Sequence, residues 1–304
     1  IALPFYVLQY EFQCLFATAE KPRLGLFVTV AAGVANMVLD ALFVGVFSWG
    51  AAGAAAATAI SQCIGGVAPL VYFARPNSSL LRLGKCRMDL RALGKTCSNG
   101  SSEFMSNVSM SLVSMLYNVQ LMKYAGEDGV SAYGVLMYVS MIFSAMFIGF
   151  SIGSAPVVSY HYGAQNKDEL KSLFRKSLVL VGGAGVTMFA ASQLFGGALV
   201  GVFVGYDPDL VALTLHGFRI YAVAFLVCGF NIYGSAFFTA LNNGKVSALV
   251  SFMRTLVFET STVMLLPLVW GVDGVWSAII VAEACALVLT VGFLVYLRKP
   301  YGYA

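Results

Sequence analysis

The chain contains Trp49-Gly50-Ala51-Ala52-Gly53 and, 221 residues later, Trp270-Gly271-Val272-Asp273-Gly274. At the same offset Gln62, a polar residue in an apolar segment, corresponds to Glu283. In each copy the Trp-Gly stretch joins two apolar segments long enough to be helices. The offset therefore indicates a repeated unit of several helices rather than a chance match of five residues.

Residues 1–73 correspond in this way to residues 222–294, and each copy holds three apolar segments. Internal repeats of membrane helices are typical of secondary transporters. The later repeat begins near residue 95, so by the same offset the earlier one begins before position 1. We therefore expect the parent protein to carry about 100 to 130 residues upstream of this chain.

The composition predicts an integral membrane protein. The chain is 59% hydrophobic and 11% charged, with a mean hydropathy of +0.83, whereas soluble domains carry about 25% charged residues. Most of its apolar stretches reach the ~20 residues needed to cross a bilayer as a helix, and they are too long for the strands of a membrane β-barrel. They comprise 1–18, 24–47, 51–73, 99–123, 130–153, 176–204, 211–240, 246–270 and 274–297.

The basic residues predict the orientation. Fifteen of the eighteen lysines and arginines lie in alternate connections or at the C-terminal end, among them Arg82, Lys171 and Lys299. The opposite connections are mainly acidic, with Glu127, Asp128, Asp209 and Asp273. By the positive-inside rule the basic side is cytoplasmic. We expect a multi-pass protein of the plasma membrane, of the bacterial inner-membrane type, with a cytoplasmic C-terminus.

The two copies enter the membrane from the same side, so the full repeat holds an even number of spans. Six spans fit residues 99–304, which form a C-terminal bundle (spans 7–12). Residues 1–73 then supply the last three spans of an N-terminal bundle (spans 4–6), and residues 74–98 form the cytoplasmic loop between bundles. The predicted fold is an all-α polytopic membrane protein with about nine of twelve spans present.

Four segments carry a family resemblance. They are Asn36–Asp40, Gly50–Thr58, Leu116–Asp128 and Gly153–Asn166, the last containing Pro156-Val-Val-Ser159 and Gly163-Ala164. In order and spacing the chain resembles the multidrug and toxic compound extrusion (MATE) family, most closely its MepA-like branch, without the first three spans. The resemblance implies a two-bundle transporter fold of six plus six helices that is monomeric in its full-length form.

Glu103 is the main candidate for ion coupling. A charged side chain within the bilayer is expensive and marks a functional site by default, and Glu103 shares a helical face with Asn107, Ser111, Ser114 and Asn118. A span-7 glutamate often binds the coupling ion in the MATE family, and Glu103 occupies the matching position. The alternative is that this polar face is an interhelical hydrogen-bonding seam.

Other polar residues within the spans are candidates for lining the cavity: Asn231, Tyr233, Glu11, Glu259 and Glu283. For Glu283 a structural hydrogen-bonding role is the favoured alternative, because its repeat mate Gln62 is neutral. Glu259 follows Arg254 by five residues, about 140° around an α-helix. We therefore expect each of these two side chains to reach another helix rather than to pair with the other.

The sequence lacks motifs of enzymes, such as a phosphate-binding Gly-x-x-x-x-Gly-Lys-Ser/Thr loop, and lacks a metal-ligand cluster. We expect no enzyme, cofactor, metal or nucleic-acid partner. The expected function is secondary active multidrug efflux of organic, cationic solutes in exchange for H⁺ or Na⁺ across the lipid bilayer. Two alternatives remain: a flippase for lipid-linked oligosaccharides or peptidoglycan precursors in the same superfamily, and an inactive membrane scaffold.

Overall fold

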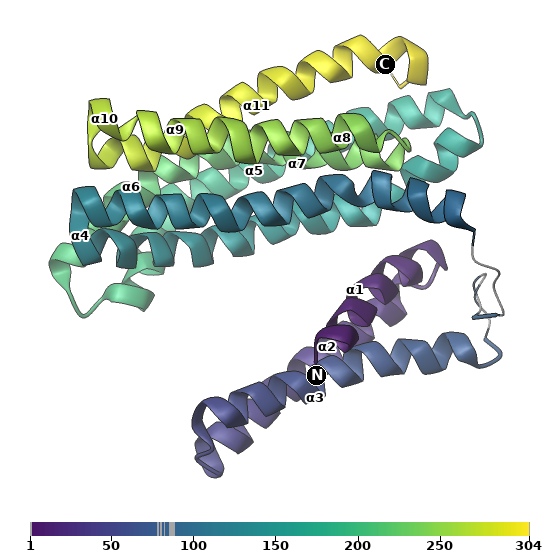
Figure 1. The fold of residues 1–304 in the computed structure, drawn as a ribbon, viewed down its shortest axis with the longest axis horizontal. Coiled ribbons are helices and arrows are strands. Elements are labelled where there is room, and N and C mark those ends of the chain that lie inside the picture. The colour runs from purple at the N-terminus through teal and green to yellow at the C-terminus, as the bar shows by residue number, and fades with distance from the viewer. Residues whose placement is uncertain (1, 78, 80, 82, 85–88, 304) are drawn as a thin grey trace. The chain divides into compact units, whose positions relative to one another are not determined.

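A computed structural model describes residues 2–77, 79, 81, 83, 84 and 89–303, and of residues 102, 103 and 106 it describes only the backbone. Nearly all of the described chain is helical. It divides into two compact units, Ile1–Met88 and Asp89–Ala304, both of which are drawn in Figure 1.

The N-terminal unit holds three helical segments. Helix α1 (Leu3–Thr18) and helix α2 (Pro22–Asp40) both begin at or beside a proline, where the missing N–H leaves no helix hydrogen bond unmade. Helix α2 continues as a π-helical turn, η1 (Ala41–Val46), and α3 (Gly50–Ala74) returns against both earlier helices.

Close helix packing in this unit depends on small residues of α3. A Cβ atom on Gly65 would lie 2.4 Å from the Gln9 side chain, and one on Gly66 would lie 2.8 Å from the Phe5 carbonyl oxygen. Small residues let membrane helices approach closely. Beside them Phe12, Phe16, Ala19 and Phe73 form a buried cluster, with Phe12 and Phe73 stacked at 5.6 Å.

The C-terminal unit begins with a long helix, α4 (Leu90–Gly163), which Gly126 breaks into two arms through a φ of 67° and a ψ of −155°. Helix α5 (Lys167–Val204) follows. The next pass comprises α6 (Pro208–Tyr221), the 3₁₀ turn η2 (Ala222–Ala224) and α7 (Phe225–Ala240). Asp89, Asn166 and Asp207 cap the N-termini of α4, α5 and α6 with their side chains.

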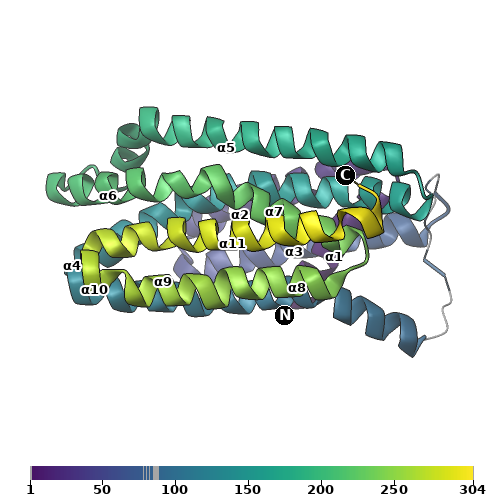
Figure 2. The same cartoon turned by 90° about the horizontal axis from the view of Figure 1, so that it is seen from above.

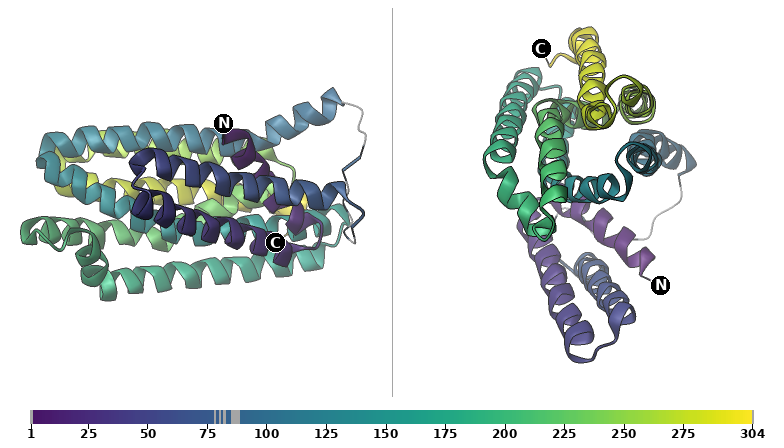
Figure 3. Two further views of the ribbon diagram at one scale, coloured as in Figure 1. Left: turned by 90° about the horizontal axis from the view of Figure 1, so that it is seen from below. Right: turned by 90° about the vertical axis from the view of Figure 1, so that its left-hand side faces the viewer.

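Two further passes complete this unit. The first comprises α8 (Gly244–Phe252), the π-helical segment η3 (Met253–Glu259), α9 (Thr260–Leu265) and α10 (Pro267–Trp270), and the second is α11 (Val272–Tyr301). Helix α11 packs against α7, η3, α9 and α10, and Figure 2 shows these segments running side by side. The end-on view in Figure 3 (right) shows the green α8–α10 pass next to the yellow α11.

The two Trp-Gly turns each contain a glycine with a positive φ. Gly50 and Gly271 both have a φ of +57°, a region that residues with a side chain rarely adopt. Three residues later the chain is tightly packed: a Cβ on Gly274 would lie 2.4 Å from the Leu266 carbonyl oxygen, and one on Gly53 would lie 3.0 Å from the Phe43 side chain. This φ and the close packing thus recur at the 221-residue offset.

The predicted all-α polytopic architecture is confirmed. Seven segments of the described chain are long and apolar enough to cross a membrane, and one of them, Asn107–Gly163, contains the second arm of α4 and part of the first. With those arms separated, and with the 16-residue α1 included, the described residues form nine helical passes. The helices extend beyond the apolar stretches: α4 begins at Leu90 rather than near 99, because the Asp89 carboxylate accepts hydrogen bonds from the first backbone N–H groups.

Candidate functional site

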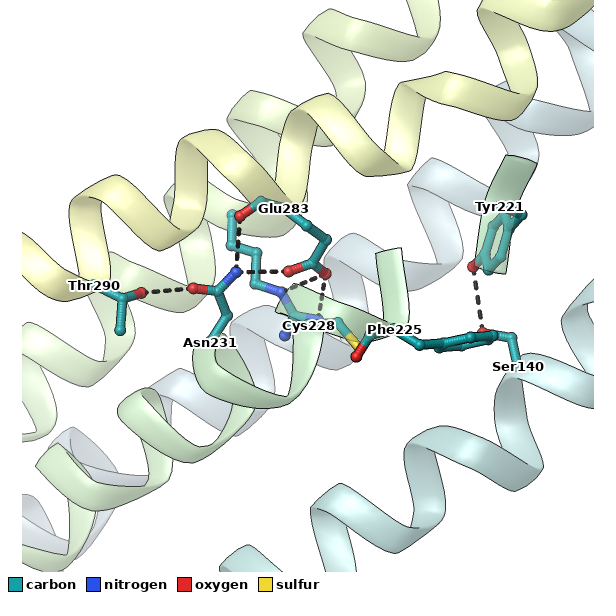
Figure 4. Close-up of polar contacts among 8 residues, drawn as sticks. Ser140, Tyr221, Phe225, Cys228, Asn231, Glu283 and Thr290 are labelled. Carbon is teal, nitrogen blue, oxygen red and sulfur yellow. Dashed lines mark hydrogen bonds and ion pairs between the residues drawn. The ribbon is translucent and has the colours of Figure 1, made fainter. Parts of the chain in front are cut away.

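A hydrogen-bonded group of buried polar side chains lies in the middle of the C-terminal unit. Glu283, which is 2% exposed, accepts on Oε1 from Arg254 Nε at 2.9 Å and Nη2 at 2.6 Å, and on Oε2 from Asn231 Nδ2 at 2.7 Å. Asn231 Oδ1 accepts from Thr290 Oγ1 at 3.0 Å. We call these four residues the Glu283 cluster; Figure 4 shows the Thr290–Asn231–Glu283 chain of contacts.

Three helical passes position these side chains. Asn231 lies on α7, Arg254 on η3, and Glu283 and Thr290 lie two turns apart on one face of α11. Helix α7 can approach α11 because residue 234 is glycine: a Cβ there would lie 2.4 Å from Thr290 Cγ2. The amide of Asn231 also donates to the Glu283 backbone carbonyl at 3.0 Å, which fixes its orientation.

A second carboxylate, Glu259, interacts electrostatically with both Glu283 and Arg254. Arg254 pairs with Glu283 on α11 rather than with Glu259 of its own segment, as the spacing of five residues predicted. Residues 253–259 form a π-helix, whose hydrogen bonds join residues i and i+5, and such segments are frequent at functional sites.

The charge balance of this region is acidic. Arg254 contributes one positive charge, whereas Glu259 and Glu283 contribute two negative charges when both are ionised. Each charge of the Arg254–Glu283 pair is hydrogen-bonded, which a buried ion pair requires. Within the described part of the chain no hydrogen bond to a Glu259 carboxylate oxygen is found. The arrangement can therefore accept one proton or one monovalent cation and become neutral.

The cluster occurs in only one of the two sequence repeats. At the 221-residue offset its members correspond to uncharged residues, namely Asn231 to Tyr10, Arg254 to Gly33, Glu283 to Gln62 and Thr290 to Pro69. The N-terminal copy thus lacks a counterpart of both the Arg254 guanidinium and the Glu283 carboxylate. This joint absence fits a pair whose members depend on each other, since either charge alone would be buried without a partner.

The polar face of α4 is described only in part. The side chain of Glu103 lies outside the residues that the structure describes. Asn107 and Ser111 are exposed, and Ser114 and Asn118 are partly buried. The hydroxyl of Ser111 and the amide of Asn118 both donate to carbonyl oxygens of their own helix, at 3.4 and 2.9 Å. The role of this face therefore stays a prediction.

The other candidates lie apart or in the packed core. Glu11 is exposed on α1 of the N-terminal unit, and Tyr233 is buried between Phe150 and Phe237. Of the residues proposed from the sequence, the structure brings together Asn231, Glu259 and Glu283. Thr290 and the pairing of Arg254 with Glu283 were missed. The charges of Arg254 and Glu283 in mid-span already indicated that each needs a partner, since charged side chains within a membrane pair with one another.

Comparison with known proteins identifies the family. Residues 104–264, more than half of the chain, match the MatE family. The chain belongs to this family. Two curated relatives are multidrug export proteins named MepA, from Staphylococcus aureus strain MSSA476 and Staphylococcus haemolyticus strain JCSC1435. Each is 22% identical to this chain over 303 and 298 residues, or 98% and 97% of its length. The chain spans about 65% of the length of these relatives.

Solved MATE structures share the fold. An outward-facing multidrug resistance MATE transporter matches 92% of this chain with a TM-score of 0.84 at 21% identity, and the chain covers 63% of that protein. A MOP-superfamily transporter from Pyrococcus furiosus also matches with a TM-score of 0.84, at 19% identity and the same coverage. The resemblance to the MATE family, the transporter fold and the multi-pass membrane assignment are confirmed. Because the curated relatives are export proteins, the family membership supports the prediction that the chain is not an enzyme.

Proposed function

We propose that this MATE chain belongs to a secondary active antiporter, which exports organic cations in exchange for H⁺ or Na⁺ by alternating access. The observation that carries the proposal is the set of two carboxylates and one guanidinium in the C-terminal unit, in which Glu283 is buried and Arg254 and Glu259 are partly buried. The names of the MepA relatives support multidrug export as the transport class. We place the protein in the plasma membrane as a monomer in its full-length form. Its C-terminus lies in the cytoplasm, as the distribution of basic residues predicts.

The coupling follows from charge. When the coupling ion neutralises the second carboxylate, the attraction for a cationic solute falls and the solute leaves on the outside. When the ion leaves on the inside, the negative charge returns and a new solute binds. Ion and solute thus oppose each other's binding, which is an unfavourable, positive coupling free energy between sites, and relative movement of two bundles alternates access.

The cationic nature of the solute is inferred from the intramembrane charges. The acidic set comprises Glu11, Glu103, Glu259 and Glu283, and only Arg219 and Arg254 oppose it. A flippase for pyrophosphate-linked lipids would require an excess of basic side chains to bind its anionic head group. The acidic excess therefore favours a cation exporter over this alternative.

Fluorescence of ethidium, a flat organic cation, tests the proposal in proteoliposomes. We expect the protein to move ethidium when an inward proton or Na⁺ gradient is imposed, and to stop when that gradient alone is collapsed. Vesicles without protein give the background leak. Ethidium movement that ignores both gradients, or no movement above background, would contradict antiport.

A further inference from the structure

Four hydroxyl side chains form a continuous hydrogen-bonded network between α7 and α8. The Thr239 hydroxyl donates to Ser247 Oγ at 2.7 Å, Ser247 Oγ lies 2.8 Å from Ser235 Oγ, and Ser235 Oγ lies 2.8 Å from Ser251 Oγ. Ser235, Ser247 and Ser251 are buried. In the two serine–serine contacts either oxygen can be the donor, whereas Thr239 is the donor to Ser247, and Ser247 also donates to the Ser235 backbone carbonyl at 2.8 Å.

One end of this network leads to the Glu283 cluster. Asn231, Ser235 and Thr239 are spaced by four residues on one face of α7, and Ser247, Ser251 and Arg254 follow one face of α8 and η3. The two faces meet through the hydroxyl contacts. One helical turn separates Ser235 from Asn231 and Ser251 from Arg254, about 5–6 Å between Cβ atoms, which is the size of gap that water-mediated contacts span.

The other end lies where α7 and α8 are joined. Helix α7 ends at Ala240 and α8 begins at Gly244. Thr239 is only partly buried, and its backbone carbonyl accepts from Asn99 Nδ2 at 3.4 Å. This turn precedes Lys245 and belongs to the side that the positive-inside rule assigns to the cytoplasm. The network therefore extends from one helical turn short of the Glu283 cluster to the predicted cytoplasmic end of the bundle.

We propose that these hydroxyls form the proton exit path from the carboxylates to the cytoplasm. The inference rests on the proposed antiport and commits to H⁺ as the coupling ion. One proton leaves the Glu259–Glu283 pair through a water molecule to Ser251 or Ser235. The Thr239 hydroxyl, which donates to Ser247 in the structure, rotates toward water, and the Ser247 hydroxyl turns from the Ser235 carbonyl to Thr239. Each hydroxyl then accepts a proton from the preceding group and passes its own to the next oxygen, and Thr239 delivers one proton to water. No hydroxyl gains or loses a proton overall, and the carboxylate pair regains one negative charge.

Substitutions that remove single hydroxyls test the path in proteoliposomes. Ser247→Ala interrupts the middle of the network, and Thr239→Val removes the last hydroxyl while keeping the shape of the side chain. Thr239→Ser keeps the hydroxyl. A matched control is Ser192→Ala on α5, because Ser192 is equally buried but donates only to its own helix, to the Met188 carbonyl at 2.8 Å.

Two rates are measured for each protein: proton flux driven by an ethidium gradient, read with an internal pH dye, and ethidium self-exchange, which needs no net proton transfer. We expect Ser247→Ala and Thr239→Val to slow proton flux at least about tenfold, since positioned proton-transfer groups contribute 10²–10⁴ in rate. Self-exchange should be unchanged, and Thr239→Ser and Ser192→Ala should behave as wild type.

Unchanged proton flux in both test variants would overturn the inference and leave the hydroxyls as a packing seam. A parallel loss of proton flux and self-exchange, in step with reduced thermal stability, would also assign them a structural role. Failure of the proposed antiport is recognised separately, because the wild-type protein would then show no proton flux driven by ethidium.

Discussion

The guanidinium of Arg254 contacts one Glu283 oxygen through two nitrogens, while Asn231 occupies the other oxygen. Such a pair contributes little net stability compared with an apolar replacement, because both ions lose their hydration. Removal of one partner is much more harmful, since the remaining charge is left buried and unpaired. Replacing both partners at once therefore costs less stability than replacing either one alone.

Glu283→Gln should therefore lower the free energy of unfolding by about 3–5 kcal/mol, because Arg254 loses its counter-charge. The double variant Arg254→Met/Glu283→Leu should recover most of this loss. Thermal unfolding in detergent micelles measures both. A control is Asp273→Asn at the exposed His216–Asp273 pair, where both side chains are 58% exposed and less than about 1 kcal/mol is expected. Equal effects at the two sites would contradict the argument.

Glu103→Gln tests the sequence-based candidate for ion coupling. The amide keeps the size of the side chain but cannot bind a proton or balance a cation, so gradient-driven ethidium efflux should be lost while expression and unfolding stay near wild type. Glu103→Asp should retain part of the activity, because it keeps the charge. Glu127→Gln, at an exposed position, serves as the control. Wild-type efflux by Glu103→Gln would remove this residue from the mechanism.

At the scale of helices and turns, the φ of +57° at Gly271 determines how α11 begins. Gly271→Ala should destabilise the protein by about 1–3 kcal/mol, because an L-residue is strained in this conformation, although a Cβ would find open space there. Gly197→Ala on α5 is the matched control, since its Cβ also meets open space but its backbone is helical. The measurement is thermal unfolding of the two variants. Equal stabilities of Gly271→Ala and Gly197→Ala would show that the turn tolerates an L-residue at this φ.

The helical segments were predictable from sequence because the membrane requires long apolar runs, and the apolar stretches correspond to the observed helices. The contacts of the candidate site were only partly predictable. Asn231 and Glu283 were recognisable as buried polar residues, but their contact joins positions 52 residues apart. Arg254 was expected to reach another helix, and it does, but the π-helical form of η3 was not predicted because nothing in the local sequence distinguishes it from an α-helix.

At the scale of the whole molecule, the alternation of basic and acidic connections predicts which ends of the helices face the cytoplasm. In a cysteine-free background, single cysteines at Glu127, Asp209 or Asp273 should react with a membrane-impermeant thiol reagent added to intact cells. Cysteines at Lys171 or Lys299 should react only after the cells are permeabilised. The reverse pattern would invert the orientation and the direction of export.

The φ of +57° that Gly50 and Gly271 share indicates which feature of the two repeats arose first. The Trp-Gly turn with its positive-φ glycine occurs in both copies, whereas the Glu283 cluster occurs in one. We infer that the turn was present before the two copies diverged and that the polar residues diverged afterwards. The sequence of one Trp-Gly turn should then be tolerated at the position of the other. Ala51→Val with Ala52→Asp gives the first turn the sequence of the second, at two exposed positions. This variant should leave membrane insertion and thermal unfolding unchanged. Misfolding would show that the two copies have diverged at the turn as well.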